Sequence, residues 1–475
     1  MKFEKIFSII IFVLWIIISL TVGINHEAWA DEAQSWLIAR DSSVFELISD
    51  VLKYDGHPIL WYLILKFLQI FHFPYKFLFI IPILFTGFGV FLLLFKSKLP
   101  LYIKYLFPFT FFIAYQYAIF GRNYSLAFPI LALIAVIFKQ RLDKMGYYAF
   151  LLILLSNVSA HCYVLAFILL LFLIYDVIKN KLVNLKSISL ITAIITVMLL
   201  TALMLIKPQD GSFPVSLHMP TFIGIIIVCV KGFFNLTYFS YDYFIKFSFI
   251  LILYILSFML YCKNLYQFIF ALSLNLGILL VLASVYANYW HCGYIILTLI
   301  FTIWILNEEN HEIIKYNYTN VLFTTCFLVM AFIQINWSLK CICFDLFHRF
   351  SGSYEAYQFI KENNLDKYDM VGLGFRTIAI QPYFKHNIYK NFDQSYWKWQ
   401  YGAEEKVYKN AINLAPIVVV DVVEMKKYQD IIENLTDEEY NLYNFNGKLC
   451  SKGEIKEPTD ILIFVKKGIL IKEHT

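Results

Sequence analysis

Apolar residues occur in thirteen runs between residues 6 and 336, and short polar connectors separate them. Most runs approach the length of about 20 residues that an α-helix needs to cross the hydrocarbon core of a bilayer. The pattern therefore predicts an α-helical polytopic membrane protein. The runs cover about residues 6 to 24, 57 to 73, 76 to 95, 105 to 120, 124 to 138, 147 to 160, 163 to 178, 187 to 206, 221 to 239, 244 to 261, 266 to 287, 293 to 306 and 319 to 336.

Basic residues in the connectors predict the orientation of the helices, because lysine and arginine concentrate in cytoplasmic loops. Basic connectors follow the runs that end near residues 95, 138, 178 and 261. If all four connectors are cytoplasmic, segments 57 to 73 and 221 to 239 cannot both be simple crossings. Each of these segments carries a lysine, Lys66 and Lys231. We therefore expect eleven crossings with these two segments interfacial or re-entrant, and thirteen crossings are the alternative. Either count places the N-terminus in the cytoplasm and the C-terminus outside.

The pattern changes after about residue 336, where long apolar runs give way to short alternating elements. Helices and strands that alternate are typical of an α/β domain. We expect residues 1–336 to form a transmembrane catalytic domain and residues 337–475 a small extracytoplasmic α/β domain. The expected elements are helices at 352 to 364 and 424 to 435, and strands at 369 to 375, 416 to 422 and 461 to 466.

Composition supports the membrane assignment and limits the partners. Hydrophobic residues make up 60% of the 475 residues and charged residues only 15%, which excludes an ordinary soluble globular protein. The net charge of +5 comes from scattered basic residues, so no nucleic-acid partner is expected. Cys341, Cys343 and Cys450 allow one disulfide if the C-terminal domain is extracytoplasmic, with one cysteine left over.

Polar residues that could carry chemistry gather in four clusters, and the expected topology places all four on the extracytoplasmic side. An ionised side chain at the bilayer centre costs about 2.5 to 3.5 kcal/mol on insertion scales, so a functional site is the default interpretation of such groups. A solvated juxtamembrane loop is the alternative for the first cluster. The clusters are Glu27 to Arg40 with Gly56-His57-Pro58, then Gly121 to Tyr124, Asn157 to His161, and Asn288 to His291.

Individual residues within these clusters suggest roles. Asp31 and Ser35 have the spacing that places them on one face of a helix. Arg122 lies between two apolar runs and needs an anion or a lipid headgroup beside it. His161 and His291, each taken alone, are more often structural histidines. No motif for a metal or other cofactor is present, although a divalent metal at Asp31 and Glu32 with further ligands stays open.

Several of these stretches together resemble a known family. The segments HEAWADEAQSWLIARD, GHPILWYLIL, GRNYSLAFPIL and NYWHCGYIIL are similar to the GT-C superfamily of membrane glycosyltransferases, in the bacterial branch akin to protein O-mannosyltransferases and aminoarabinose transferases. The resemblance covers about residues 1 to 340. The segment FSGSYEAYQFIKENNL is similar to the start of the exported domain of some bacterial members.

The resemblance implies roles for matching residues. Asp31 matches the catalytic aspartate of the first external loop, and Glu32 matches its acidic neighbour. His57 matches the histidine that follows this loop, although Ile59 replaces the usual second proline. With Arg122, His57 is expected to contact the phosphate of the donor. The other expected substrate-binding residues are Arg40, His161 and His291.

These observations predict a multi-pass glycosyltransferase of the cell membrane. The family implies a polyprenyl-phosphate-linked sugar as donor, transfer with inversion outside the cytoplasm, and a cell-envelope glycan, lipid or protein as acceptor. Asp31 would act as general base, since a carboxylate can accept the proton of the acceptor. The alternative is a transporter or flippase of a lipid-linked saccharide, which usually shows internal repeats and polar groups near the midplane.

Overall fold

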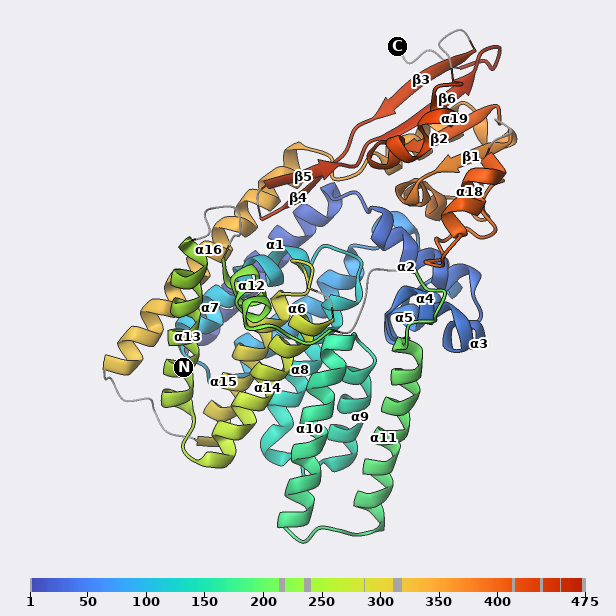
Figure 1. The fold of residues 1–475 in the computed structure, drawn as a ribbon. Coiled ribbons are helices and arrows are strands. Elements are labelled where there is room, and N and C mark those ends of the chain that lie inside the picture. Colours follow the sequence, from blue (N-terminus) through green and yellow to red (C-terminus); the bar gives the residue numbers. More distant parts are fainter. Residues whose placement is uncertain are drawn as a thin grey trace.

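The computed structural model describes residues 2–212, 218–234, 241–285, 287–310, 318–411, 415–435, 439–452 and 454–471. Helices dominate, and a small sheet region follows them at the C-terminal end (Figure 1). The fold thus agrees with a helical membrane protein that carries a C-terminal α/β region.

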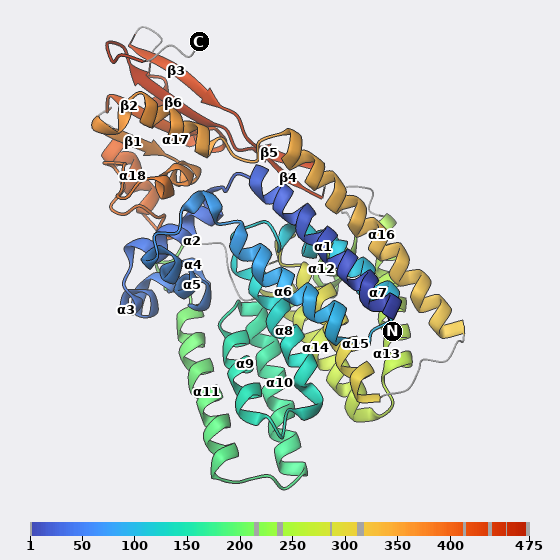
Figure 2. The ribbon, with the colours of Figure 1, turned by 180° about the vertical axis from the view of Figure 1, so that it is seen from behind.

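Eight helical segments of the described chain are long and apolar enough to cross a membrane. Many of their apolar side chains are exposed on the outside of the bundle, as contact with lipid requires. Seen from behind, α1 lies beside α6 and α16 (Figure 2). The helices within these segments are α1 (Lys2–Asn25), α6 (Ile80–Lys96), α8 (Ala127–Ile137), α10 (Ala160–Lys179), α11 (Leu185–Leu205), α13 (Tyr241–Tyr261), α14 (Leu265–Ser284) and α16 (Tyr318–Phe347).

The two segments expected to be interfacial or re-entrant form short helices. α5 (Leu60–Ile70) and α12 (Phe222–Phe233) have 11 and 12 residues, fewer than a crossing needs. α9 (Met145–Ser156) is also short, whereas α15 (Gly293–Asn310) is buried along most of its length. The structure therefore supports a helical membrane protein, and it leaves the expected count of eleven or thirteen crossings untested.

The run at 105 to 120 is not one helix, contrary to what its apolar character suggests. α7 (Leu101–Leu106) is followed by a 3₁₀ turn at Phe107–Phe109 and a π-helical turn at Phe112–Gln116. Pro108 in this segment has no N–H for a helical hydrogen bond. A second 3₁₀ turn, Asn123–Leu126, leads into α8. Non-helical backbone at membrane depth is tolerated where protein covers it, and this stretch is buried.

A compact helical segment follows α1 at the end of the bundle near the C-terminal domain. It contains α2 (Ala30–Asp41), α3 (Val44–Glu46), a π-helical turn (Leu47–Val51) and α4 (Leu52–Asp55) before α5 begins. Gly56 ends α4 with a φ of 72°, a left-handed conformation that glycine adopts without strain. This turn brings His57 back toward α2.

The C-terminal domain contains a four-stranded sheet with the order β1-β2-β6-β3, in which β1 and β2 are parallel and the other pairs antiparallel. β4 and β5 form a separate hairpin beside α16. The elements are α17 (Ser353–Glu362), β1 (Met370–Leu373), a 3₁₀ segment (Phe375–Tyr383), α18 (Ala403–Ala411), β2 (Ile417–Asp421), a 3₁₀ segment (Val422–Tyr428), α19 (Gln429–Ile432), β3 (Tyr440–Phe445), β4 (Lys448–Ser451), β5 (Glu454–Pro458) and β6 (Ile461–Lys466).

The expected elements of this domain are partly confirmed. The helix at 352 to 364 and the three strands are present as α17, β1, β2 and β6. The helix expected at 424 to 435 is wrong, because a 3₁₀ segment and the single turn α19 occupy it. The sequence patterns missed α18 and the strands β3, β4 and β5. α16 continues to Phe347, so the expected boundary at residue 336 falls inside this helix.

The C-terminal domain packs directly on α2. The Gln34 side chain donates to the carbonyl of Trp397 at 2.7 Å and accepts from the Trp397 N–H at 2.9 Å. Arg40 Nη1 donates to the carbonyl of Phe384 at 2.6 Å. The segment after α1 and the C-terminal domain therefore lie at the same end of the helical bundle (Figure 1).

Candidate active site

The Glu32 side chain caps the N-terminus of α2 and fixes the orientation of its first turn. The Glu32 carboxylate accepts a hydrogen bond from the backbone N–H of Trp29 at 3.1 Å. Its other oxygen accepts from the Gly121 N–H at 2.6 Å. A Cβ on Gly121 would lie 2.5 Å from Leu78, so only glycine permits this close approach. Glu32 is thus anchored, and consecutive helical residues point in different directions, so Asp31 is directed elsewhere.

A cavity of about 600 Å³ lies on the Asp31 side of α2, and we call it the Asp31 cavity. It combines polar groups at one end with apolar walls from α11, α14 and the C-terminal domain. Its lining residues are Asp31, Gln34, Asp55, Gly56, His57, Arg122, Asn123, Tyr124, Ser159, Ala160, His161, Leu205, Ile206, Lys207, Val281, Val285, Trp290, His291, Phe375 and Trp399.

The Asp31 carboxylate faces this cavity and makes no hydrogen bond or ion pair to any described residue. Burial raises the pKa of Asp31, and the nearby positive charge of Arg122 opposes this shift. A carboxylate with a raised pKa and no fixed partner is suited to accept a proton from a bound ligand.

Arg122 is held beside Asp31 by three hydrogen bonds. Its Nη1 donates to the Asp31 backbone carbonyl at 2.6 Å and to Ser35 Oγ at 2.7 Å, and its Nη2 lies 2.9 Å from His57 Nε2. The buried Nε has no partner among the described residues. A guanidinium has five N–H groups, so the one on Nε and one on Nη2 have no acceptor among the described residues.

His57 supports Arg122 rather than adding a positive charge. Arginine nitrogens can only donate, so His57 Nε2 accepts and the proton of the neutral ring is on Nδ1. Burial lowers the pKa of His57, and the charge of Arg122 lowers it further. Nδ1 lies 4.0 Å from the Asp55 carboxylate. We therefore assign His57 as a positioning residue for Arg122.

His161 and His291 also line the Asp31 cavity. Their rings stack with centroids 4.8 Å apart, and His161 also stacks on Tyr294 at 5.1 Å. Trp290 Nε1 donates to His291 Nε2 at 3.1 Å. Burial and the neighbouring His161 hold the pKa of His291 well below its usual value. The structure thus brings Asp31, His57, Arg122, His161 and His291 together around one cavity.

Asp55, Lys207 and two aromatic residues also belong to this cavity, and the sequence patterns did not single them out. Asp55 accepts from the Tyr62 hydroxyl and from Gln34 Nε2. Phe375 and Trp399 come from the C-terminal domain, more than 300 positions from α2 in the chain. Only the position of Asp55 immediately before Gly56-His57 gave a signal in the sequence.

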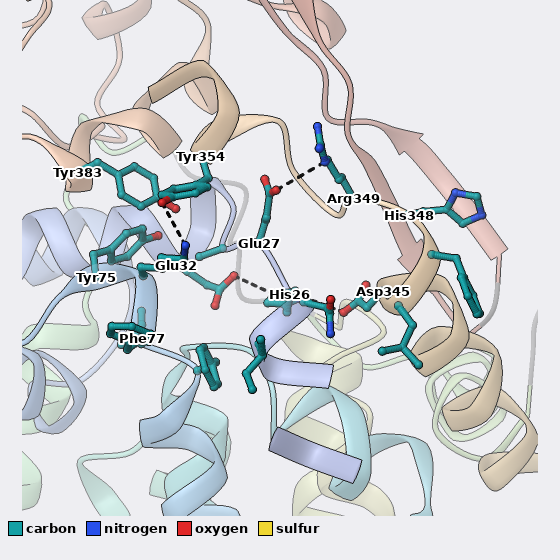
Figure 3. Close-up of a pocket in the computed structure, with 18 residues that line it drawn as sticks. His26, Glu27, Glu32, Tyr75, Phe77, Asp345, His348, Arg349, Tyr354 and Tyr383 are labelled. Atoms are coloured by element: carbon teal, nitrogen blue, oxygen red, sulfur yellow. Dashed lines mark hydrogen bonds and ion pairs between the residues drawn. The ribbon is translucent and has the colours of Figure 1, made fainter. Parts of the chain in front are cut away.

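Glu32 lines a second cavity, of about 420 Å³, which we call the Glu32 cavity (Figure 3). His26 stands between Glu32 and Asp345, with ring nitrogens 3.4 Å and 2.9 Å from their carboxylates. Burial alone would lower the pKa of His26, but Asp345 and Glu32 raise it to about 10. Glu32 is therefore occupied by structural contacts and faces away from the Asp31 cavity.

Arg40, expected to bind substrate, lies outside both cavities. It pairs with Asp41 at 2.6 Å and contacts the backbone of the C-terminal domain. Its position at the end of α2 gives it a role in holding the two parts of the molecule together.

No protein-family model, curated protein or solved structure matches this chain. The functional argument therefore depends on the residues of the site itself. Among the described residues, no group of three or more histidine, cysteine, aspartate or glutamate side chains is arranged to hold a metal ion. The Asp31 cavity offers a carboxylate base, an arginine with unused donors and an apolar wall.

Proposed function

We propose that this protein is an inverting glycosyltransferase of the cell membrane. It would move a sugar from a polyprenyl-phosphate donor to a cell-envelope glycan, lipid or protein on the extracytoplasmic side. The observation that carries the proposal is the Asp31 carboxylate, which faces a cavity without a partner among the described residues, beside an Arg122 with two N–H groups that these residues do not use.

The Asp31 cavity has residues that suit the donor phosphate, the polyprenyl chain and the acceptor. The unused donors of Arg122 match two oxygens of a phosphate, a geometry in which arginine binds strongly. Leu205, Ile206 and Val281 supply apolar surface for the first part of a polyprenyl chain. Asp31, next to this arginine, would face the acceptor.

The reaction forms one bond to the anomeric carbon and breaks another. Asp31 takes the proton of the acceptor nucleophile as that atom attacks the sugar. The bond from the anomeric carbon to the phosphate oxygen breaks, and polyprenyl phosphate leaves with the electron pair. Arg122 stabilises the charge that develops on this oxygen. His57 and Ser35 keep the guanidinium in place.

A transporter of a lipid-linked saccharide fits the geometry less well. Its polar groups would be expected near the middle of the membrane. Here Asp31, His57 and Arg122 lie at the end of the helices that also carries the C-terminal domain.

The experiment is release of polyprenyl phosphate by the purified full-length protein in detergent micelles. Lipid-linked donors and acceptors extracted from the native membrane are supplied together, and mass spectrometry measures the release. We expect release that depends on acceptor, and a loss of about 10²- to 10⁴-fold in Asp31→Asn, as is typical for a missing general base.

Asp50→Asn is the matched control, because Asp50 is exposed and pairs with Lys398 at 3.2 Å outside the cavity. It should retain transfer. Absence of release from the wild-type protein with every extracted donor, combined with movement of labelled donor across vesicles, would replace the transferase by a flippase.

A further inference from the structure

The Glu32 cavity opens where two membrane-spanning helices end. α1 ends at Asn25 and α16 ends at Phe347, and both ends line the cavity. Four apolar side chains of the lining are exposed, and the largest exposed fractions are those of Ile24 at 69%, Phe77 at 44% and Phe347 at 80%. Apolar exposure of this size is favourable only beside lipid chains or another apolar partner. The cavity therefore has an apolar rim at membrane level.

The interior contains two carboxylate oxygens that lack donors. Glu27 Oε2 and Asp345 Oδ1 are buried, and neither has a hydrogen-bond partner among the described residues. The Asp345 side chain is fully buried while lining the cavity. Buried acceptors without partners cost free energy, and a ligand that brings N–H donors would remove this cost.

Glu27 is a mostly buried carboxylate with no cation in hydrogen-bond contact among the described residues. Burial raises the pKa of Glu27 to about 7, although Arg349 lies nearby and opposes the shift. The closest distance between Arg349 Nε and the Glu27 carboxylate is 4.0 Å, too long for a hydrogen bond. A positively charged ligand group at this position would stabilise the ionised carboxylate.

Two cations of the chain lie near the same cavity. Lys76 donates to the Tyr354 hydroxyl at 3.0 Å, which uses one of its three N–H groups. Arg349 pairs with Glu355, and its side chain is 53% exposed. In Figure 3 the Glu27 carboxylate points toward Arg349, and Glu32, His26 and Asp345 lie below it. The cavity thus presents negative groups in its interior and positive groups toward its edge.

We propose that the Glu32 cavity binds the headgroup of a zwitterionic phospholipid that carries a primary amine. The ammonium would donate to Glu27 and Asp345, the phosphate would lie near Lys76 and Arg349, and the acyl chains would leave over Ile24, Phe77 and Phe347. A volume of about 420 Å³ accommodates such a headgroup.

The arrangement distinguishes this ligand from other lipids. A choline headgroup has the same charges but no N–H to donate to the two carboxylate oxygens. A glycerol headgroup has hydroxyl donors but brings no positive charge to the buried carboxylates. The site is separate from the Asp31 cavity, and its occupancy does not require the proposed transfer reaction.

The test measures which lipids the full-length protein retains. The delipidated protein is exchanged into micelles with equal amounts of phosphatidylethanolamine, phosphatidylcholine and phosphatidylglycerol that share the same acyl chains, and native mass spectrometry counts bound lipids. We expect phosphatidylethanolamine to be retained about tenfold more than either other lipid, as the loss of a charged hydrogen bond implies.

Variants connect this selectivity to the cavity. Glu27→Gln and Asp345→Asn should each reduce the preference, and Glu27→Gln alone is decisive if the second variant does not fold. Glu405→Gln is the matched control, because Glu405 is exposed on α18 and should leave the preference unchanged. Asp31→Asn should lose transfer and keep the lipid preference, so that the two proposals fail separately.

Three results would overturn the proposal. Equal retention of phosphatidylcholine and phosphatidylethanolamine would show that no N–H donor is recognised. An unchanged preference in folded Glu27→Gln and Asp345→Asn would place the lipid elsewhere. Binding of soluble phosphoethanolamine as tight as that of the lipid would show that the membrane source is wrong.

Discussion

The two cavities on either side of the first turn of α2 differ in how their carboxylates are satisfied. Glu32 receives donors from Gly121, Trp29 and His26, whereas Asp31 receives none from the described residues. Arg122 near Asp31 keeps unused N–H groups, whereas His26 near Glu32 has both ring nitrogens beside carboxylates. Two adjacent acidic residues therefore have different surroundings: Glu32 is held by structural contacts, whereas Asp31 has no fixed partner among the described residues.

The largest expected effect is the contrast between the two acidic residues. Asp31→Asn should reduce transfer by about 10²- to 10⁴-fold with unchanged thermal stability, since it removes a base that has no structural partner. Glu32→Gln should lower the free energy of unfolding by about 1 to 3 kcal/mol and reduce transfer less than tenfold. Transfer rates and thermal unfolding of both variants measure this. Loss of transfer in a stable Glu32→Gln protein would reverse the roles.

The next effect concerns His26, which lines the Glu32 cavity and forms ion pairs with Glu32 and Asp345. Its folded-state pKa of about 10 lies above the unfolded value of about 6.5, so its stabilisation is fully present below pH 6.5. This contribution is lost as the pH rises through about 10. His26→Gln should therefore be less stable than wild type by about 3 to 5 kcal/mol at low pH.

Thermal unfolding of both proteins between pH 6 and 10.5 checks this expectation. The difference in stability between wild type and His26→Gln should disappear toward high pH. A difference in stability that is constant across the range would mean that His26 acts through packing. The ion pairs of His26 with Glu32 and Asp345 would then not distinguish the two cavities.

A smaller effect is expected at Arg122, which we propose binds the phosphate of the donor. Lysine keeps the charge of Arg122 but cannot hold two phosphate oxygens and also contact Ser35 and His57. Arg122→Lys should weaken donor binding about tenfold to a hundredfold. Arg40→Lys is the matched control, because Arg40 lies outside both cavities, and it should change donor affinity little. Equal losses in both variants would remove Arg122 from the donor site.

The smallest effect on activity is expected at the cysteines near the Glu32 cavity. The sulfur atoms of Cys341 and Cys450 lie 3.9 Å apart and are buried, whereas Cys343 is exposed. If the C-terminal domain is extracytoplasmic, host oxidants should join the first two, so that alkylation of denatured, unreduced protein labels Cys343 but neither Cys341 nor Cys450. Reduction should expose all three to the reagent in peptide mapping. Labelling of all three before reduction would contradict the disulfide and weaken the topology.

The sequence showed more of the Asp31 cavity than of the Glu32 cavity. Asp31, His57 and Arg122 lie in short polar stretches beside apolar runs, and a topology argument placed these stretches on one side. The Glu32 cavity depends on Asp345, which is 319 residues from His26 in the chain. No local pattern links residues so far apart, and Asp345 lies within a helix that the sequence analysis ended at residue 336.

The C-terminal domain shows the same limit. Strands β1, β2 and β6 are continuous buried runs that a local pattern detects. β3 and β5 are mostly exposed and carry mixed residues, and β4 is a strand of only four residues. Their pairing depends on partners elsewhere in the chain, so their local sequence gave no clear period.

The sequence by itself determined the membrane class, the C-terminal α/β region and the polar stretches that hold Asp31 and Arg122, because apolar length and charge placement are local properties. Only the tertiary structure decided that Asp31 and Glu32 face different cavities, that His57 is a neutral support for Arg122, and that Cys341 lies beside Cys450. Side-chain direction and hydrogen-bond partners depend on contacts between distant segments, and those contacts form only when the helices pack.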